Sequence, residues 1–390
     1  MASIGGAEGV FLRTPGPRQM TMSEETQTTE TAFTDATRPL VMLLLPLSGR
    51  TAGAAEAVRD GFLSAYFAAD VSLRPRLGVR DTVRGGFVTA YLDAVAAGAS
   101  AVVGPLTKED VAAALPVADS RVVTLALNLA PDGAVVPPRF YQYALAPEDE
   151  ARQLAQALAA AGKTVGVALV PSGDWGKRVL DAFQSAFTAA GGQLAASRSY
   201  ASGTSDYSGY IAELVGFEDS RARHRALVAA VGVPLEFTPR RRDSVGFLFM
   251  AGQPVQGRLI RPQLKYNYAG ELPIYSISDM YEPSPTANQD LDGLVFTDMP
   301  WMLAPDAATL GAREDAQSLW SEGTRRRSRL YAFGADAFRL LDELRSPDTF
   351  RDTLAGFTGR LTLGPQGRVM RTLDWAQIQA DGSIKPIGGP

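Results

Sequence analysis

Short apolar runs alternate along the chain with stretches in which apolar residues recur every three or four positions. The first run, VMLLL at residues 41–45, is followed directly by PLSGR. A short run that is apolar throughout is typical of a strand covered on both faces, and proline and glycine end it. Beyond this turn, Ala54, Val58 and Phe62 fall on one face of a helix. The pattern predicts a strand, a tight turn and a helix.

The same alternation continues in two series that separate near residue 143. The expected strands lie at residues 41–45, 76–79, 101–103 and 122–127 in the first series, and at residues 164–169, 193–199, 245–250 and 274–278 in the second. Strands that alternate with helices form parallel sheets through right-handed crossovers. We therefore expect an α/β fold of two doubly wound parallel-sheet lobes joined by a three-strand hinge.

The domain boundaries follow from the break between the two series and from YAFGADAFRLLDEL at residues 331–344, an amphipathic helix that we assign to the first lobe. We expect hinge strands at residues 140–144, 294–298 and 359–363. The predicted parts are a disordered segment at residues 1–38, a first lobe at 39–143 plus 301–357, and a second lobe at 144–300 plus 358–390. The first segment is rich in Thr, Glu, Gly and Ser, and it shows neither a periodic apolar face nor a signal peptide.

Composition excludes several classes of protein. The chain has 390 residues, a formal net charge of −4, no cysteine and a single histidine, His224. The charge argues against nucleic-acid binding. The absence of cysteine excludes disulfides, thiolate metal sites and cysteine nucleophiles. Because His224 lies in the polar stretch RARHR, we expect it to be solvated, and we expect no catalytic residue, no metal and no cofactor. No apolar segment is long enough for a membrane helix.

Polar and glycine-containing turns follow the strands of the first series, at PLSGR, GPLT and ALN. The carboxyl ends of parallel strands share one sheet edge, where ligands usually bind. The turn at Ser48 and Arg50 can bind an anion or a polar ligand near a helix start, although Ser48 can instead simply cap that helix. The arginine runs at residues 240–242 and 325–327 are expected to be solvated, with contact to an acidic partner or an anionic lipid as the alternative.

Several blocks of the sequence resemble the LppC-type family of penicillin-binding-protein activators, over residues 39–387. The most specific blocks are PQLKYNYAG and DLDGLVFTDMPW, and LLLPLSGR, VVGPLTKE and the closing TGRLTLGPQGRVMRTLDWAQI agree with them. The family's domain is similar to type I periplasmic binding proteins, in agreement with the two-lobed pattern. Two family features do not appear in this sequence: a signal peptide with its lipidated cysteine, and an amino-terminal helical repeat domain.

The resemblance implies a non-catalytic protein of the Gram-negative envelope, periplasmic and associated with the outer membrane. It would bind and activate a bifunctional peptidoglycan synthase of the penicillin-binding-protein class. Carried over by position, a cleft for a small polar ligand would use the strand ends of both lobes, with Asp279 and Asp298 as its carboxylates. The candidate cleft residues are Ser48, Gly49, Gly104, Leu106, Thr107, Asn128, Ser172, Trp175, Ser278 and Asp279.

Two functions of different classes remain open at this point. The adaptor that activates a synthase is favoured by PQLKYNYAG and DMPW. The alternative is a solute receptor for an ABC importer, which would hold an amino acid or an amide in an enclosed, charged cleft. An enzyme is a distant third, because the sequence offers no nucleophile–base pair and no set of metal ligands.

Overall fold

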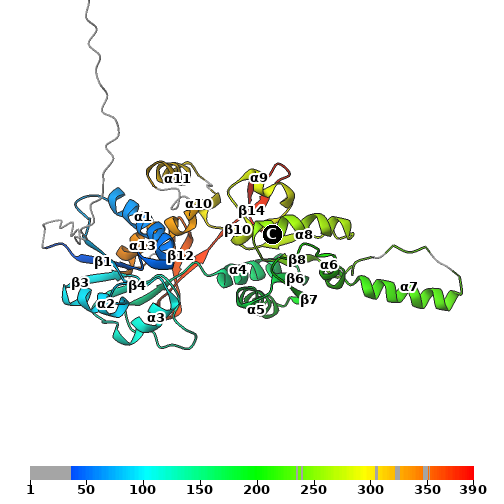
Figure 1. Cartoon of the computed structure of the whole chain (residues 1–390), viewed down its shortest axis with the longest axis horizontal. Coiled ribbons are helices and arrows are strands. Elements are labelled where there is room, and N and C mark those ends of the chain that lie inside the picture. The colour runs from blue at the N-terminus through cyan, green and yellow to red at the C-terminus, as the bar shows by residue number, and fades with distance from the viewer. Residues whose placement is uncertain are drawn as a thin grey trace, which may run out of the picture.

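The chain folds around two separate β-sheets (Figure 1). This computed structural model describes residues 37–390 except 234–235, 239, 304–305, 321–325, 346–349 and 351. The disorder expected for residues 1–38 therefore concerns residues that lie outside the described part, apart from Thr37 and Arg38. Arg38 belongs to the fold, because its Nη1 donates to the carbonyl oxygen of Val71 at 2.7 Å.

The first sheet has eight strands within the described residues, in the order β11-β12-β13-β5-β4-β3-β1-β2. The strands from β2 to β13 run parallel, while β12 pairs antiparallel with both β13 and β11. Their bounds are β1 Leu40–Leu45, β2 Arg76–Asp81, β3 Ala99–Val103, β4 Val123–Ala126, β5 Phe140–Tyr143, β11 Leu354–Gly356, β12 Gly359–Leu363 and β13 Arg368–Thr372.

The second sheet has seven strands in the same part of the chain, in the order β15-β14-β10-β9-β8-β6-β7. The strands from β7 to β10 are parallel, and β14 and β15 add an antiparallel edge. Their bounds are β6 Val165–Pro171, β7 Gln193–Tyr200, β8 Phe247–Met250, β9 Ile274–Ser276, β10 Val295–Asp298, β14 Asp374–Ile378 and β15 Ile384–Ile387.

Helices cover both faces of each sheet, because successive strand residues point to opposite sides. On the first sheet, α1 (Ala52–Ala68) and α13 (Ser328–Arg345) pack on one face, and α2 (Phe87–Ala96) and α3 (Lys108–Ala114) on the other. On the second, α6 (Ser208–Val215) and α8 (Pro254–Tyr266) oppose α4 (Pro147–Ala160) and α5 (Asp174–Ala189). Further α-helices within the described residues are α7 (Phe217–Val231), α9 (Pro285–Asn288), α10 (Pro300–Leu303) and α11 (Ala307–Leu319).

Two glycines allow α1 and α13 to pack in direct backbone contact. A Cβ at Gly61 would lie 1.8 Å from the carbonyl oxygen of Tyr331, and one at Gly334 would lie 1.9 Å from that of Val58. No side chain fits at such distances, so the backbones approach only because both positions are glycine. This contact fixes α13 on the first lobe, where the sequence analysis assigned it.

The predicted fold class is confirmed, since the two alternating series form two different sheets. Each expected strand is present to within three residues at either end. One difference concerns the last part of the chain: β12 and β13 fall within residues assigned to the second lobe, yet they pair into the first sheet. The third passage between the sheets is therefore at Leu373 rather than near Thr358. The antiparallel strands there lack the strand–helix alternation on which the boundary was based.

Candidate functional site

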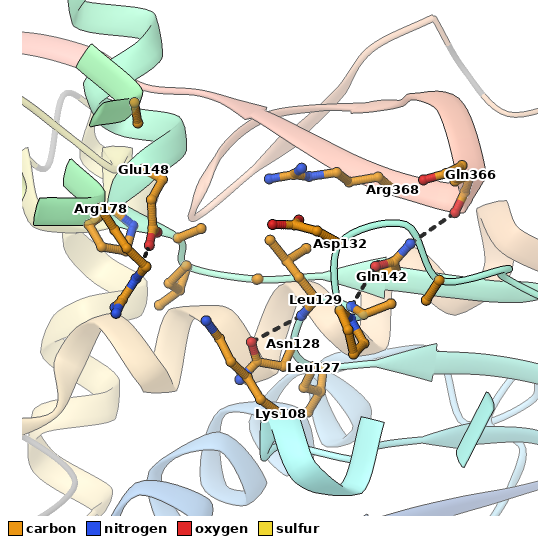
Figure 2. A pocket seen from close by; sticks show the side chains of 18 of the residues that line it. Lys108, Leu127, Asn128, Leu129, Asp132, Gln142, Glu148, Arg178, Gln366 and Arg368 are labelled. Atoms are coloured by element: carbon orange, nitrogen blue, oxygen red, sulfur yellow. Dashed lines mark hydrogen bonds and ion pairs between the residues drawn. The ribbon is translucent and has the colours of Figure 1, made fainter. Parts of the chain in front are cut away.

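A cavity of about 910 Å³ lies between the two lobes (Figure 2). The first lobe contributes the loop that follows β4, at residues 127–134, together with Lys108 at the start of α3. The second lobe contributes Trp175 and Arg178 of α5. Phe333 of α13 also lines the cavity. This volume lies in the range of small-molecule sites, so the cleft is large enough for a ligand.

The amide side chains in the cleft hold its wall in place. Asn128 Nδ2 donates to the carbonyl oxygen of Leu106 at 3.0 Å, and its Oδ1 accepts from the backbone N–H of Leu129 at 3.0 Å. Gln142 Oε1 accepts from the N–H of Ala130 at 2.8 Å, and its Nε2 donates to the carbonyl oxygen of Gln366 at 3.1 Å (Figure 2). Both amides therefore already bond to the backbone that surrounds the cavity.

The charged side chains at the cleft are also largely paired. Arg178 Nε lies 2.7 Å from Glu148 Oε1. Burial raises the pKa of Glu148, but the hydrogen bond and charge of Arg178, a backbone hydrogen bond and the charge of Lys108 together outweigh it, so the pKa is lowered overall. Arg368 Nη2 donates to both oxygens of Asp149, at 2.7 and 2.6 Å. Two of the acids in the first turn of α4, Glu148 and Asp149, therefore pair with arginines.

Three of the ten candidate cleft residues line the cavity, namely Leu106, Asn128 and Trp175. Thr107 caps α3, where its Oγ1 accepts from the N–H of Asp110 at 3.2 Å. Ser48 precedes the short helix at Gly49–Thr51, where its hydroxyl helps to lower the pKa of Asp81 against the opposing effect of burial. Seven candidates lie outside the cavity lining: Ser48, Gly49, Gly104, Thr107, Ser172, Ser278 and Asp279.

The structure explains why residue 104 is a glycine. Its φ is +120°, and a Cβ there would lie 2.1 Å from the carbonyl oxygen of Leu44. The residue therefore allows the turn after β3 to pass close to β1.

The other candidates outside the cavity lining differ in exposure. Ser172 is exposed, as are Gly49 and Asp279, whereas Ser278 is buried. Whether any of these ten residues contacts a ligand stays a prediction.

Three arginines from elements of the first lobe bind three carboxylates of the second, and this network was not predicted from the sequence. Arg368 of β13 pairs with Asp149 of α4, as described above. Arg371 Nη2, also on β13, lies 3.5 Å from Glu150 Oε1 on α4. Arg329 Nη2 on α13 lies 2.5 Å from Asp298 Oδ2 at the end of β10. We call these three pairs the interlobe clasp.

The pair between Arg329 and Asp298 contains the most deeply buried carboxylate of the clasp. The side chain of Asp298 is fully buried. Arg329 Nη2 also donates to the carbonyl oxygens of Ser278 and Tyr281, at 3.1 and 3.3 Å. Burial alone would lower the pKa of Arg329, but the charge and the hydrogen bond of Asp298, together with the charges of Glu150 and Asp279, outweigh it and raise the pKa. Asp298 was expected to bind a small polar ligand. In the structure it is instead paired with the guanidinium of Arg329.

Apolar packing joins the lobes beside the clasp. Trp301 of α10 is buried, its indole N–H donates to Ser328 Oγ at 2.6 Å, and its ring lies 5.4 Å from that of Tyr331. Tyr331 belongs to the core of the second lobe, while Phe333, two residues later on α13, belongs to the core of the first. The two cores therefore meet on one helix.

The described part of the chain contains no group of three or more His, Asp or Glu residues arranged to hold a metal ion. Across the same residues, no helix combines the length and the apolar character needed to cross a membrane.

Comparison with known proteins gives a consistent result over most of the chain. Residues 25–381 match the family model described as LppC lipoprotein. The penicillin-binding protein activator LpoA of Photobacterium profundum is 32% identical over 351 residues, which cover 88% of this chain and 56% of that protein. LpoA of Vibrio cholerae is 28% identical, with 86% and 56% covered. The chain thus spans about half the length of the curated relatives it matches.

Solved structures agree with the sequence comparisons. The LpoA C-domain from Haemophilus influenzae, described as a regulator of PBP1A, superposes with a TM-score of 0.68 at 25% identity, over 89% of this chain and 99% of that one. A Chromobacterium violaceum protein assigned to branched-chain amino acid ABC transport has a TM-score of 0.64 at 26% identity, over 87% and 100%. A Rhodospirillum rubrum protein of the same assignment, 19% identical with a TM-score of 0.69, shows the shared fold.

Proposed function

Because the chain belongs to the LppC lipoprotein family, we propose that it is a non-catalytic envelope protein that binds and activates a peptidoglycan synthase of the penicillin-binding-protein class. Relatives across most of its length carry the name of penicillin-binding protein activator. The domain that it matches end to end is described as a regulator of PBP1A. By the same family relationship we place it in the periplasm, in association with the outer membrane.

The interlobe clasp is the observation that favours an adaptor over a solute receptor. A receptor of this fold closes its lobes around a ligand by a hinge motion. In this chain Arg329, Arg368 and Arg371 already connect the lobes, and Trp301 packs beside them. Opening or closing would separate a fully buried carboxylate from its guanidinium, which is costly in a low-dielectric interior. A fixed arrangement of the lobes suits a protein that presents a surface to a partner.

Exposed aromatic residues at the end of α8 support a protein partner. Tyr266 is 81% exposed and Tyr268 is 66% exposed, within the block PQLKYNYAG. Tyrosine is enriched where proteins bind one another, since its large ring is buried at little cost in conformational entropy. Val255 and Leu259 extend the exposed apolar residues along the same helix. We include this side of α8 in the proposed contact with the synthase.

The test measures synthase binding and amino-acid binding with the same purified chain. The probes are the purified periplasmic part of the bifunctional penicillin-binding protein from the same organism and, in a separate calorimetric titration, the common amino acids. We expect the synthase to bind and its transpeptidase rate to rise, while the amino acids release no heat of binding. Saturable binding of an amino acid without capture of the synthase would establish the receptor instead.

Paired variants locate the contact. Ser48→Ala with Asn128→Ala should leave the Kd for the synthase within about twofold, because a contact of roughly 800 Å² per partner does not fit inside a cleft. Tyr266→Ala with Tyr268→Ala should weaken binding at least about tenfold, because tyrosine is enriched among the few contact residues that carry most of the binding energy. The opposite ranking of the two double variants would place the contact in the cleft.

A further inference from the structure

Helix α7 projects from the second lobe, away from the rest of the molecule (Figure 1). Only its first turn is anchored, since Phe217 and Ser220 are buried. None of residues 221–231, all of which the structure describes, is buried. We refer to residues 221–231 as the projecting arm. Helices in proteins usually depend on packing of one face for their stability, and this one has little packing beyond its base.

The base of the arm is built firmly, so its direction is set by the fold. Arg242 Nε donates to Asp219 Oδ2 at 2.9 Å, and the N–H of Arg242 donates to the carbonyl oxygen of Val215 at 2.9 Å. Gly216, with φ of +76°, turns the chain from α6 into α7, and the side chain of Arg242 fills the space where its Cβ would lie. The N–H of Arg240 donates to Ser220 Oγ at 3.2 Å.

The surface of the arm is basic around an apolar strip. Leu227 and Val231 are each 53% exposed, and their four-residue spacing puts them on one side of the helix. Arg221, Arg223 and Arg225 are exposed, and residues 221–231 contain no Asp or Glu. The arm therefore carries a formal charge of +3 in a chain whose net charge is −4, which leaves −7 on the remainder.

The arrangement of these side chains indicates a protein partner rather than a lipid surface. Helices that lie in a membrane interface have a strongly polar face opposite the apolar one. Opposite Leu227 and Val231, the arm instead exposes mainly alanines, Ala222 and Ala229, with Arg225 as the one charged residue among them. An apolar strip with a charged rim is the usual composition of a protein–protein contact. Because arginine pairs best with carboxylates, that partner surface should be acidic.

We propose that the projecting arm docks on an acidic surface of the synthase, with Leu227 and Val231 against an apolar centre and Arg221, Arg223 and Arg225 against surrounding carboxylates. The proposal rests on the proposed function, because it takes the synthase as the partner. It adds a second contact to the exposed side of α8. Beyond its base, the described chain contacts the arm at His224, whose ring stacks on that of Phe237 at 4.2 Å, while Leu227 and Val231 each stay about half exposed.

The test compares two variants that change the net charge equally. The first combines Arg221→Glu, Arg223→Glu and Arg225→Glu, which together reverse the formal charge of the arm. Arg50→Glu, Arg84→Glu and Lys385→Glu together are the matched control on exposed positions elsewhere. With the purified periplasmic part of the penicillin-binding protein, we expect the arm variant to bind at least about tenfold more weakly and the control within about twofold. Affinity should also fall less steeply with salt in the arm variant.

A second variant keeps the test independent of charge. Leu227→Ser with Val231→Ser should weaken binding several-fold, while the melting temperature stays near that of the wild type because both side chains are half exposed. If the wild type binds the synthase and all arm variants bind equally well, the arm proposal is wrong and the proposed function stands. If the wild type itself fails to bind, both are wrong. A flotation assay with phosphatidylglycerol vesicles tests the lipid alternative. If the wild type floats with the vesicles, the arm variant does not, and both bind the synthase equally well, then the arm binds lipid and the proposal is wrong.

Discussion

At the scale of a single residue, burial between the lobes changes the pKa of Glu150. Its carboxylate is buried between the lobes, 3.5 Å from Arg371, and its Oε2 accepts from the N–H of Ser278 at 3.0 Å. Burial raises the pKa of Glu150 to about 7, although the charge of Arg371 acts in the opposite direction, and the charge of Asp298 adds to the rise. The group therefore titrates near neutral pH in the folded protein.

Glu150→Gln should alter how stability depends on pH. The folded pKa of about 7 lies above the ordinary value of 4.5, so between these values the folded state holds the proton more tightly than the unfolded state. Stability must then fall as pH rises through this window. At about 1.4 kcal/mol per pH unit, the wild type should lose up to roughly 3 kcal/mol between pH 5 and pH 8 that the variant does not lose. Urea unfolding at several pH values measures this.

Glu213→Gln is the control for this titration, because Glu213 is exposed and pairs only at the surface with Arg198. It should reproduce the pH dependence of the wild type. Parallel pH profiles for the wild type and Glu150→Gln would show that Glu150 does not titrate in this range.

Helix packing governs stability at the scale of elements. The crossing of α1 and α13 holds the first lobe together, and α13 then reaches into the core of the second lobe through Tyr331. The crossing depends on Gly61 and Gly334, which the sequence alone presents as unfavourable residues in a helix. Their value is that they bring the two backbones into contact.

Gly334→Ala should destabilise the protein although alanine is the better helix former. The added Cβ would lie 1.9 Å from a backbone oxygen, so the helices must separate, at about 3 kcal/mol by analogy with overpacked cores. Gly209→Ala in α6 is the matched control, since a Cβ there meets nothing within 4 Å. It should stabilise by up to about 1 kcal/mol. Equal melting temperatures for the two variants would contradict the close crossing.

At the scale of the whole molecule, the clasp and the shared core determine how the lobes are held. Arginines from one lobe and carboxylates from the other are paired at three places, and Trp301 packs against Tyr331 in the core of the second lobe. The cleft is large enough for a ligand, but the clasp connects its two walls. We expect its shape in solution to be the same with and without added solutes.

Arg329→Met should both destabilise the chain and loosen the lobes. It leaves the buried Asp298 without its counter-charge, which costs about 3–5 kcal/mol. Asp298→Asn in addition should restore part of that loss, since removal of both charges avoids an isolated one. Urea unfolding gives the energies, and small-angle X-ray scattering should show a larger radius of gyration for the single variant. A scattering profile identical to that of the wild type would mean that the clasp does not hold the lobes.

The spacing of apolar residues along the sequence was by itself enough to predict most of the architecture. Mostly apolar strands that alternate with periodic helices define two parallel sheets, because a strand covered on both faces is predominantly apolar. The same pattern placed α13 with the first lobe. It failed at β12 and β13, where antiparallel strands follow one another without a helix and nothing local states which sheet they join.

Tertiary structure alone decided the site. Leu106, Asn128 and Trp175 were predicted to lie at the cleft because they follow strand ends, and they line it. The sequence could not show that the polar groups of Asn128 bond to the surrounding backbone. Asp149 and Arg368 are more than two hundred residues apart in sequence, and Arg329 meets Asp298 across the lobes. The pattern of a sequence reports which face of an element is buried, whereas the pairing of charges between lobes depends on distances that only the folded chain establishes.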